Sequence, residues 1–280
     1  MRNKGKIMTK AFLIVSLFGS ALLYAQDPDR VTVPFSDPAR PHTLKAHLLN
    51  GGITVKGYDG KDAIIEARPR GPERERHARR RDPENIQGLK RIDNKNTGLT
   101  VEEQDNVISV GTGSMGNTID LMIQVPVNTS LKLNTLNSGA IVVENINGEI
   151  EVNDLNGPVT ITNVSGSVIA HSLNSKVTAV LNKVTPDKAM SFTSMNGNID
   201  VTLPADMKAK VKMKTDNGEI YSDFDIRMDA NVKPVIEDSR SKGGKYRVKI
   251  EHTMTGTING GGPEIQFQTF NGNIYIRKAK

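Results

Sequence analysis

The sequence contains no cysteine and no tryptophan, and aromatic residues make up only 4% of its 280 residues. The absence of cysteine excludes disulfide bonds, thiolate metal sites and thiol nucleophiles. A chain without disulfides must be held together by its core alone. With so few aromatic rings, we expect this core to consist mainly of small β-branched side chains.

Motifs for metal binding and nucleophilic catalysis are also missing. The five histidines have no ligand spacing such as His-x-x-x-His. The glycine-rich segment at residues 111–116 lacks the Gly-x-Ser-x-Gly spacing, and residues 260–262 lack the lysine that a phosphate-binding loop requires. We therefore expect no catalytic residues, no metal and no cofactor.

The beginning of the chain has the layout of a secretory signal peptide. A basic start is followed by an apolar run over residues 11–25 that ends on the small residue Ala25. The basic residues are Arg2, Lys4, Lys6 and Lys10. An uncleaved membrane anchor is the alternative, but a bilayer span needs about 20 apolar residues. We expect residues 1–25 to be removed and the protein to be exported, to the periplasm or the extracellular space.

The leader accounts for most of the positive charge. The formal net charge is +6, and residues 1–25 hold four basic residues and no acidic residue, which leaves +2 for the remainder. A nearly neutral protein has little general affinity for polyanions. No nucleic-acid-binding motif is recognisable, so nucleic acid is not an expected partner.

Short turn signals recur along the middle of the chain. From Asn137, successive signals follow in steps of 10, 9, 9 and 9 residues, and later steps of 22 and 21 residues correspond to about two units each. The predicted turn-forming residues are Asn147, Gly148, Asn156, Gly157, Asn196, Gly197, Asn217, Gly218, Asn271 and Gly272. Such a fixed period indicates a repeat architecture.

Apolar residues follow each turn signal at regular positions. In the unit that starts at Asn147 they stand three, five and eight residues later, at Ile150, Val152 and Leu155, with Glu149 and Glu151 between them. Alternation with a period of two places apolar side chains on one face of a strand. Each unit therefore predicts a half-buried strand.

Two architectures fit these units. Asn-Gly favours tight turns because glycine adopts positive φ freely and asparagine tolerates it. In a β-sandwich or hairpin meander each turn reverses the chain, whereas in a solenoid each turns a corner and like residues stack. The constant spacing favours a single-stranded β-solenoid with coils of roughly 20 residues, and the sandwich or meander stays open.

The repeat domain is expected over residues 44–280, after an extended lead-in at residues 26–43. An Arg-rich loop at residues 69–87, which is rich in proline and poor in apolar residues, interrupts it. The segment around Pro126 also has an echo around Pro204: Val125-Pro126-Val127-Asn128 resembles Leu203-Pro204-Ala205-Asp206. This echo supports one continuous repeat.

Several of these segments are similar to those of a known family. The unit Ile146-Asn147-Gly148-Glu149-Ile150-Glu151-Val152, the Pro126 and Pro204 segments and the closing run at residues 256–262 resemble the putative-adhesin family of bacterial β-strand-repeat proteins, a domain of unknown function. The resemblance covers residues 45 to 278. It implies a β-solenoid and a role in adhesion or at the cell envelope, and it implies no catalytic residues.

The Arg-rich loop is the strongest charged feature. Its arginines outnumber its acids by five over residues 68–81. Arginine binds phosphate, sulfate and carboxylate groups in bidentate fashion. The candidate anion-binding residues are Arg74, Arg76, Arg79, Arg80 and Arg81. The expected partners are envelope polysaccharide, anionic lipid or a membrane protein, and a solvated loop without a partner is the alternative.

Together these features predict a non-enzymatic binding or structural protein of the bacterial cell envelope. One alternative is a carbohydrate-active enzyme, a lyase or hydrolase on a β-helix, because stacked units could bring two outward carboxylates together. Its candidate acids are Glu149, Glu151, Asp154, Asp200, Glu219 and Asp223. A second alternative is an envelope scaffold or sensor component with a protein partner. The sequence leaves the ligand and the oligomeric state open.

Overall fold

The computed structural model describes residues 29–70, 97–113, 117–137, 139–229, 235–238, 246–249 and 253–280. Every regular element in this part of the chain is a β-strand, which confirms the predicted all-β class. None of these residues forms a helix that could cross a membrane. The predicted signal peptide lies outside the described residues.

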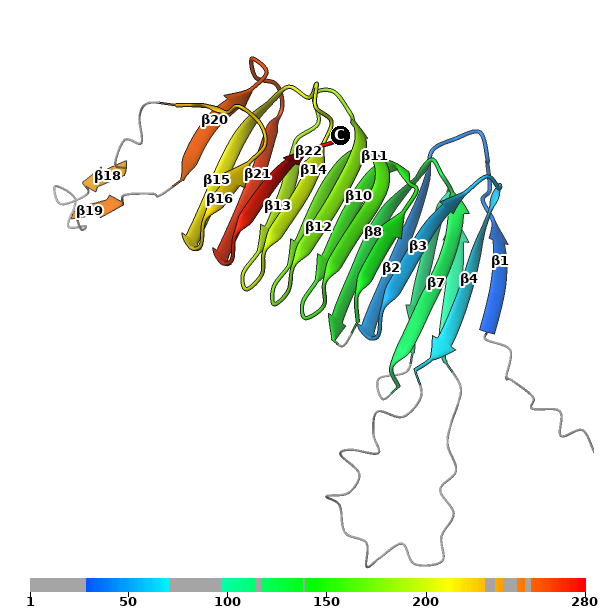
Figure 1. Cartoon of the computed structure of the whole chain (residues 1–280). Coiled ribbons are helices and arrows are strands. Elements are labelled where there is room, and N and C mark those ends of the chain that lie inside the picture. Colours follow the sequence, from blue (N-terminus) through cyan, green and yellow to red (C-terminus); the bar gives the residue numbers. More distant parts are fainter. Residues whose placement is uncertain are drawn as a thin grey trace, which may run out of the picture.

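The strands form two long rows, which we call ladder A and ladder B (Figure 1). Ladder A contains, in spatial order, β5 (Leu99–Gln104), β6 (Val107–Thr112), β2 (His42–Asn50), β8 (Thr129–Asn137), β10 (Asn147–Asp154), the second half of β11 (Val159–Ser172), β13 (Met190–Ser194), β21 (Glu264–Asn271), β15 (Ala209–Asn217), β20 (Met254–Ile258) and β17 (Arg227–Met228). Ladder B contains β1 (Asp29–Pro34), β4 (Asp62–Pro69), β7 (Ile119–Pro126), β3 (Ile53–Tyr58), β9 (Ile141–Glu144), the first half of β11, β12 (Val177–Val184), β14 (Ile199–Leu203), β22 (Ile274–Lys278) and β16 (Ile220–Ser222).

Pairing is parallel through the middle of both ladders and antiparallel at three of their four ends. β5 pairs antiparallel at one end of ladder A, and β20 and β17 do so at the other. At the start of ladder B, β4 and β1 are antiparallel. Because β11 runs from ladder B into ladder A, hydrogen bonding joins both ladders into one 20-stranded sheet. A separate hairpin is formed by β18 (Val235–Asp238) and β19 (Tyr246–Lys249).

The inward residues of both ladders form one continuous hydrophobic core. Like residues stack on like residues in register along each ladder. One such column of buried β-branched side chains in ladder B consists of Ile53, Ile141, Val159, Val177, Ile199 and Ile274. Burial alternates along the strands, as the two-residue period predicts. A narrow core between two ladders suits such short side chains, and tryptophan is not needed to fill it.

Two pairs of consecutive strands lie between strands that precede or follow them in the sequence. We call a ladder A strand together with the ladder B strand that follows it a rung. The rung β2–β3 lies between β6–β7 and β8–β9, because β2 pairs with both β6 and β8, and β3 with both β7 and β9. The rung β21–β22, from the end of the chain, lies in the same way between β13–β14 and β15–β16.

These inserted rungs explain the sequence echo around Pro126 and Pro204. Pro126 ends β7, and the link to β8 passes the inserted rung β2–β3. Pro204 follows β14, and the link to β15 passes the inserted rung β21–β22. The repeated motif therefore marks the two links that skip a rung.

The corners from ladder A to ladder B carry a column of asparagines. Each side-chain amide donates from Nδ2 to Oδ1 of the next asparagine, at 2.8 to 3.2 Å. The column runs through Asn137, Asn156, Asn174, Asn196, Asn271 and Asn217. From Asn137 to Asn196, successive corner asparagines are 18 to 22 residues apart.

The reason predicted for the Asn-Gly signals is wrong at the predicted positions. All ten predicted turn residues are described, and none has φ in the left-handed range; positive φ occurs elsewhere, as at Asn145 and Asn163. The corner glycines are needed for close approach instead. A Cβ atom on Gly197 would lie 2.2 Å from the carbonyl oxygen of Ser175, and one on Gly157 would lie 1.5 Å from that of Gly139.

Asn147 and Gly148 have a different position from the other predicted turn residues. They start β10 on the opposite edge, in register with Ser165 and Gly166. Units of nine residues therefore alternate between the two edges. The apolar residue eight positions into a unit also depends on the edge: Val164 is buried, but Leu155 is 38% exposed. Leu155 is not an inward residue of its unit, because the alternation of buried residues continues from Val152 to Asp154.

The predicted lead-in and loop are only partly described. Residues 29–34 of the lead-in form β1, which pairs with β4, and β2 begins at His42. The predicted loop begins where β4 ends, at Pro69.

Candidate functional site

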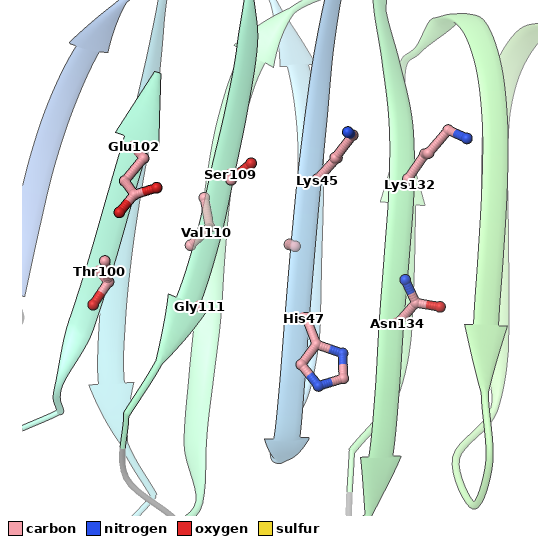
Figure 2. A pocket seen from close by; sticks show the side chains of 10 residues that line it. Lys45, His47, Thr100, Glu102, Ser109, Val110, Gly111, Lys132 and Asn134 are labelled. Atoms are coloured by element: carbon pink, nitrogen blue, oxygen red, sulfur yellow. The ribbon is translucent and has the colours of Figure 1, made fainter. Parts of the chain in front are cut away.

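The outer face of ladder A has an open groove of about 390 Å³ near its β5 end (Figure 2). Four neighbouring strands line it: β5, β6, β2 and β8. The lining residues are Lys45, Ala46, His47, Thr100, Glu102, Ser109, Val110, Gly111, Lys132 and Asn134. The groove is a candidate ligand site, since binding sites are concave and combine an apolar base with a few polar groups.

Small residues on β6 create the hollow. Gly111 has no side chain, and a Cβ atom added to it would meet no atom within 4 Å. On β6 the outward positions are Ser109 and Gly111, whereas the neighbouring strand β2 presents Lys45 and His47 in register with them. Larger side chains on both sides of a strand with small ones leave a trough along that strand.

The groove walls carry opposite charges. Antiparallel pairing places Glu102 of β5 beside Ser109 on one side. Parallel pairing places Lys45 on the other side and Lys132 one strand further. Figure 2 shows both lysine side chains extending from β2 and β8 toward the side away from Glu102. A ligand in the trough would meet ammonium groups on one wall and a carboxylate on the other.

Hydrogen bonds to Glu103 hold β5, the strand that forms the acidic wall, in place. Ser36 donates its hydroxyl to both oxygens of Glu103 at 2.8 Å and its amide at 3.2 Å, and the amide of Asn106 donates at 3.0 Å. The Ser36 hydroxyl lowers the pKa of Glu103 most, and the two backbone amides also lower it, against a smaller opposing effect of burial. The charged form of Glu103 therefore ties the Ser36 segment to the β5–β6 turn.

The lysine row continues along ladder A beyond the groove. Lys132 Nζ lies 3.2 Å from Glu151 on the next strand, and both side chains are about half exposed. An exposed pair of this kind contributes little to stability, so Lys132 can exchange this partner for a ligand. Lys45 has no ion-pair partner within the described residues.

The predicted anion-binding arginines lie outside the described residues: Arg74, Arg76, Arg79, Arg80 and Arg81. The two arginines that precede them are described, and both are paired within the chain. Arg68 pairs with Glu66, two residues earlier. Two of the charges counted toward the loop therefore have intramolecular partners.

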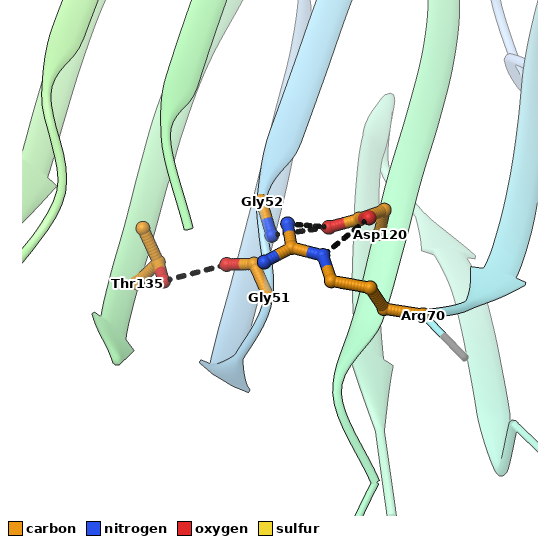
Figure 3. Close-up of polar contacts among 5 residues, drawn as sticks. All are labelled: Gly51, Gly52, Arg70, Asp120 and Thr135. Atoms are coloured by element: carbon orange, nitrogen blue, oxygen red, sulfur yellow. Dashed lines mark hydrogen bonds and ion pairs between the residues drawn. The ribbon is translucent and has the colours of Figure 1, made fainter. Parts of the chain in front are cut away.

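Arg70 has a structural contact at the base of the predicted loop (Figure 3). Its Nε donates to Asp120 Oδ2 at 2.9 Å, and its Nη2 also pairs with Asp120 Oδ1. The same Oδ1 accepts the backbone amide of Gly52 at 2.8 Å. Asp120 thereby joins Arg70 to the corner of the inserted rung β2–β3.

The six candidate catalytic acids do not share one environment. Four have side-chain partners: Glu149 pairs with Lys188, Glu151 with Lys132, Asp200 with Arg277 at 2.7 Å, and Glu219 accepts from Tyr221. Asp223 accepts the backbone amide of Lys278. Asp154 is 1% exposed and faces inward beside a corner, so an outward position for this acid is wrong. Within the described residues, no three His, Asp or Glu side chains form a group that could hold a metal.

Sequence reasoning did not find the groove. Strand β5 begins 49 residues after β2 ends at Asn50, and β2 separates β6 from β8 in space. The one available signal was the pair of small residues Ser109 and Gly111, two positions apart and separated by the apolar Val110. Small residues at alternate positions indicate a hollow only when the neighbours are known.

Comparisons with known proteins gave similar solved structures at low sequence identity. A putative cell adhesion protein from Clostridium sporogenes is 11% identical, with a TM-score of 0.44, and the match covers 90% of this chain and 100% of that one. A putative adhesin from Bacteroides fragilis is also 11% identical, with a TM-score of 0.27 and coverage of 91% and 98%. No protein-family profile matches the sequence, and no curated protein is similar to it.

Proposed function

We propose that this chain is a non-enzymatic binding protein of the bacterial cell envelope, folded as a β-solenoid, which binds an acidic polysaccharide in the groove over β5, β6, β2 and β8. The observation that carries the proposal is the trough along Ser109 and Gly111, with lysines on one wall and Glu102 on the other.

The solenoid is supported by the path of the chain. Leu131, Ile150 and Val168 are register partners on successive parallel strands of ladder A. Between each of these residues and the next, the chain passes once through ladder B and returns to ladder A. Parallel neighbours need a crossover between them, and here the crossover is a strand of the opposite ladder. The sandwich alternative shares the two facing ladders but connects strands by hairpins.

The ligand class follows from the two walls of the groove. Ammonium groups at Lys45 and Lys132 suit carboxylate or sulfate groups. Glu102, Thr100 and Asn134 offer acceptors and donors that suit hydroxyl groups. An acidic polysaccharide carries both kinds of group, and neighbouring strands about 4.8 Å apart offer them at regular intervals. Envelope location rests on the expected leader at residues 1–25.

The test measures binding of purified residues 26–280 to immobilised polygalacturonate, with neutral dextran as the reference polymer. Replacing Lys45 and Lys132 together by glutamine should weaken binding at least about tenfold, since a hydrogen bond to a charged group contributes about 1.5–3 kcal/mol. Binding should also fall as salt is raised.

A matched control uses Lys212 on β15. It stands in the same outward row as Lys45 and Lys132, at the far end of ladder A. Lys212→Gln should leave binding unchanged. Equal loss from both variants would indicate general charge attraction and contradict a groove. Binding to anionic vesicles instead would indicate a lipid ligand, and release of soluble fragments from the polymer would overturn the non-enzymatic assignment.

A further inference from the structure

An inward-facing polar position lies just inside the asparagine corners, two residues before each corner asparagine. At five rungs it holds a threonine or serine whose hydroxyl donates to a backbone carbonyl oxygen at the corner of the neighbouring rung, at 2.9 to 3.0 Å. These residues are Thr135, Ser172, Ser194, Thr215 and Thr269. Figure 3 shows one of these bonds, from Thr135 to Gly51. Each of these hydroxyl groups therefore links its own corner to the corner of the neighbouring rung by a hydrogen bond.

Asp154 occupies the same position in the middle of this column. It is in register with Thr135 on β8 and with Ser172 on β11. Its side chain is 1% exposed. Oδ1 accepts two backbone amides, from Gly157 at 2.7 Å and Asn156 at 3.1 Å. Oδ2 has no hydrogen-bond partner within the described residues.

The carbonyl that Asp154 should reach by analogy is that of Gly139, at the corner of the preceding rung. A Cβ atom built on Gly157 would lie 1.5 Å from the Gly139 oxygen and 2.6 Å from Asp154 Oδ2, so these two oxygens are neighbours. An ionised carboxylate offers only acceptors, whereas a protonated carboxyl has one O–H donor. Two buried acceptors that face each other are unfavourable.

We propose that Asp154 is a proton-binding site of the native fold, in which Oδ2 is protonated and donates to the Gly139 carbonyl oxygen, completing the column of corner bonds. Proton release leaves a buried charge opposite a carbonyl and weakens this corner. The central rungs of the two ladders are therefore more stable at acidic pH than at neutral pH.

The surroundings of Asp154 agree with this assignment. Burial raises its pKa, and this effect outweighs the two backbone amides, which lower it. The residues in register, Thr135 and Ser172, carry no charge, and the inward residues Ile141 and Val159 that start the next ladder B strands are apolar. The nearest charges along β10, those of Glu151 and its partner Lys132, are on the outer face.

The sign of the pH effect follows from the raised pKa. A carboxyl whose pKa is higher in the folded than in the unfolded state stabilises the fold fully below the unfolded-state pKa. That stabilisation is lost as pH rises through the folded-state pKa. Acidification should therefore favour the wild-type protein over a variant that cannot titrate at position 154.

The experiment compares the melting temperatures of the wild-type protein and Asp154→Asn at about pH 8 and about pH 4. The side-chain amide introduced by this substitution would keep the acceptor for Gly157 and supply a permanent donor to Gly139, so the variant resembles the neutral acid. At about pH 8 the variant should melt roughly 5 °C higher. This difference should shrink toward zero at about pH 4.

Two further variants separate the proposal from general effects of charge. Asp154→Ser should behave like Asp154→Asn, because Ser172 already accepts the amide of Ser175 at 3.2 Å while it donates to Gly157. The exposed Asp206→Asn should show no such pH-dependent difference. A difference that stays constant with pH would overturn the proposal, as would a carbon-13 titration of the Asp154 carboxyl with no upward shift of its pKa.

Discussion

Asn156 donates a hydrogen bond from its side-chain Nδ2 to Oδ1 of Asn137 at 3.2 Å, across 19 residues of sequence. The same contact repeats along the corners, so each central asparagine donates to one neighbour and accepts from the other. Only a side-chain amide offers both a donor and an acceptor in this planar arrangement. The corners therefore require asparagine for its side chain rather than for its backbone.

Removing one donor from the asparagine column should weaken the fold. Asn196 donates to Asn174 at 2.9 Å and accepts from Asn271 at 2.8 Å. Asn196→Asp removes the donor, places a charge against the Asn174 oxygen, and should lower the free energy of unfolding by about 1–2 kcal/mol. Chemical denaturation measures this change. Asn182→Asp, at an exposed position of β12, is the control and should be nearly neutral; equal effects would contradict the column.

The corner glycines should tolerate no side chain, unlike the groove glycine. A Cβ atom on Gly197 would lie 2.2 Å from the Ser175 carbonyl oxygen, so Gly197→Ala forces two stacked corners apart. We expect a loss of about 3 kcal/mol, the upper range for overpacking. Gly111→Ala, where the added atom meets open space, should leave the melting temperature almost unchanged. A mild effect at Gly197 would mean that the rungs are less tightly stacked.

The inserted C-terminal rung should depend on one aromatic contact. Phe267 stacks on Phe192 of the neighbouring rung with ring centroids 5.5 Å apart, and both rings are fully buried. Phe267→Ala should lower the free energy of unfolding by about 3–5 kcal/mol. The matched control is Phe270→Ala on the same strand, where the ring is 46% exposed. Similar losses from both variants in a denaturant titration would contradict the insertion of β21 between β13 and β15.

The Arg70–Asp120 pair should be coupled to the Gly52 corner. Asp120 accepts from Arg70 and from the amide of Gly52, so Asp120→Ala leaves that amide without its partner. We expect a loss of about 1–2 kcal/mol for Asp120→Ala and less for Arg70→Ala, since both charged groups are about one-third exposed. A double-mutant cycle on unfolding measures the coupling. A larger loss from Arg70→Ala would indicate that the arginine has a further role.

Sequence patterns predicted the strands well because the signals are local. Alternation identifies the inward face of a strand from a few neighbouring residues, and the strand predicted after Asn147 is β10, with Ile150 and Val152 buried. The Asn-Gly positions were also informative, although their role was misassigned. A turn signal shows that the chain bends, but not which backbone approaches the bend.

The inward position of Asp154 could not be predicted from its neighbours in the sequence. An acid beside a turn is usually exposed, so its inward position was not expected. Its burial depends on Thr135, Ser172 and the corner of Gly139, which come from other rungs. Contacts between rungs are set by register, and register is not visible in a single strand.

The sequence by itself determined the all-β class, the nine-residue unit, the inward alternation and the absence of thiol chemistry, because each depends on the order of neighbouring residues or on composition. Only the tertiary structure decided that the rungs β2–β3 and β21–β22 insert between others, and that β6 and β2 together form a groove. Pairing of this kind joins segments far apart in the chain. Which strands pair depends on how well the side chains of complete strands pack together, and a short stretch of residues does not contain this information.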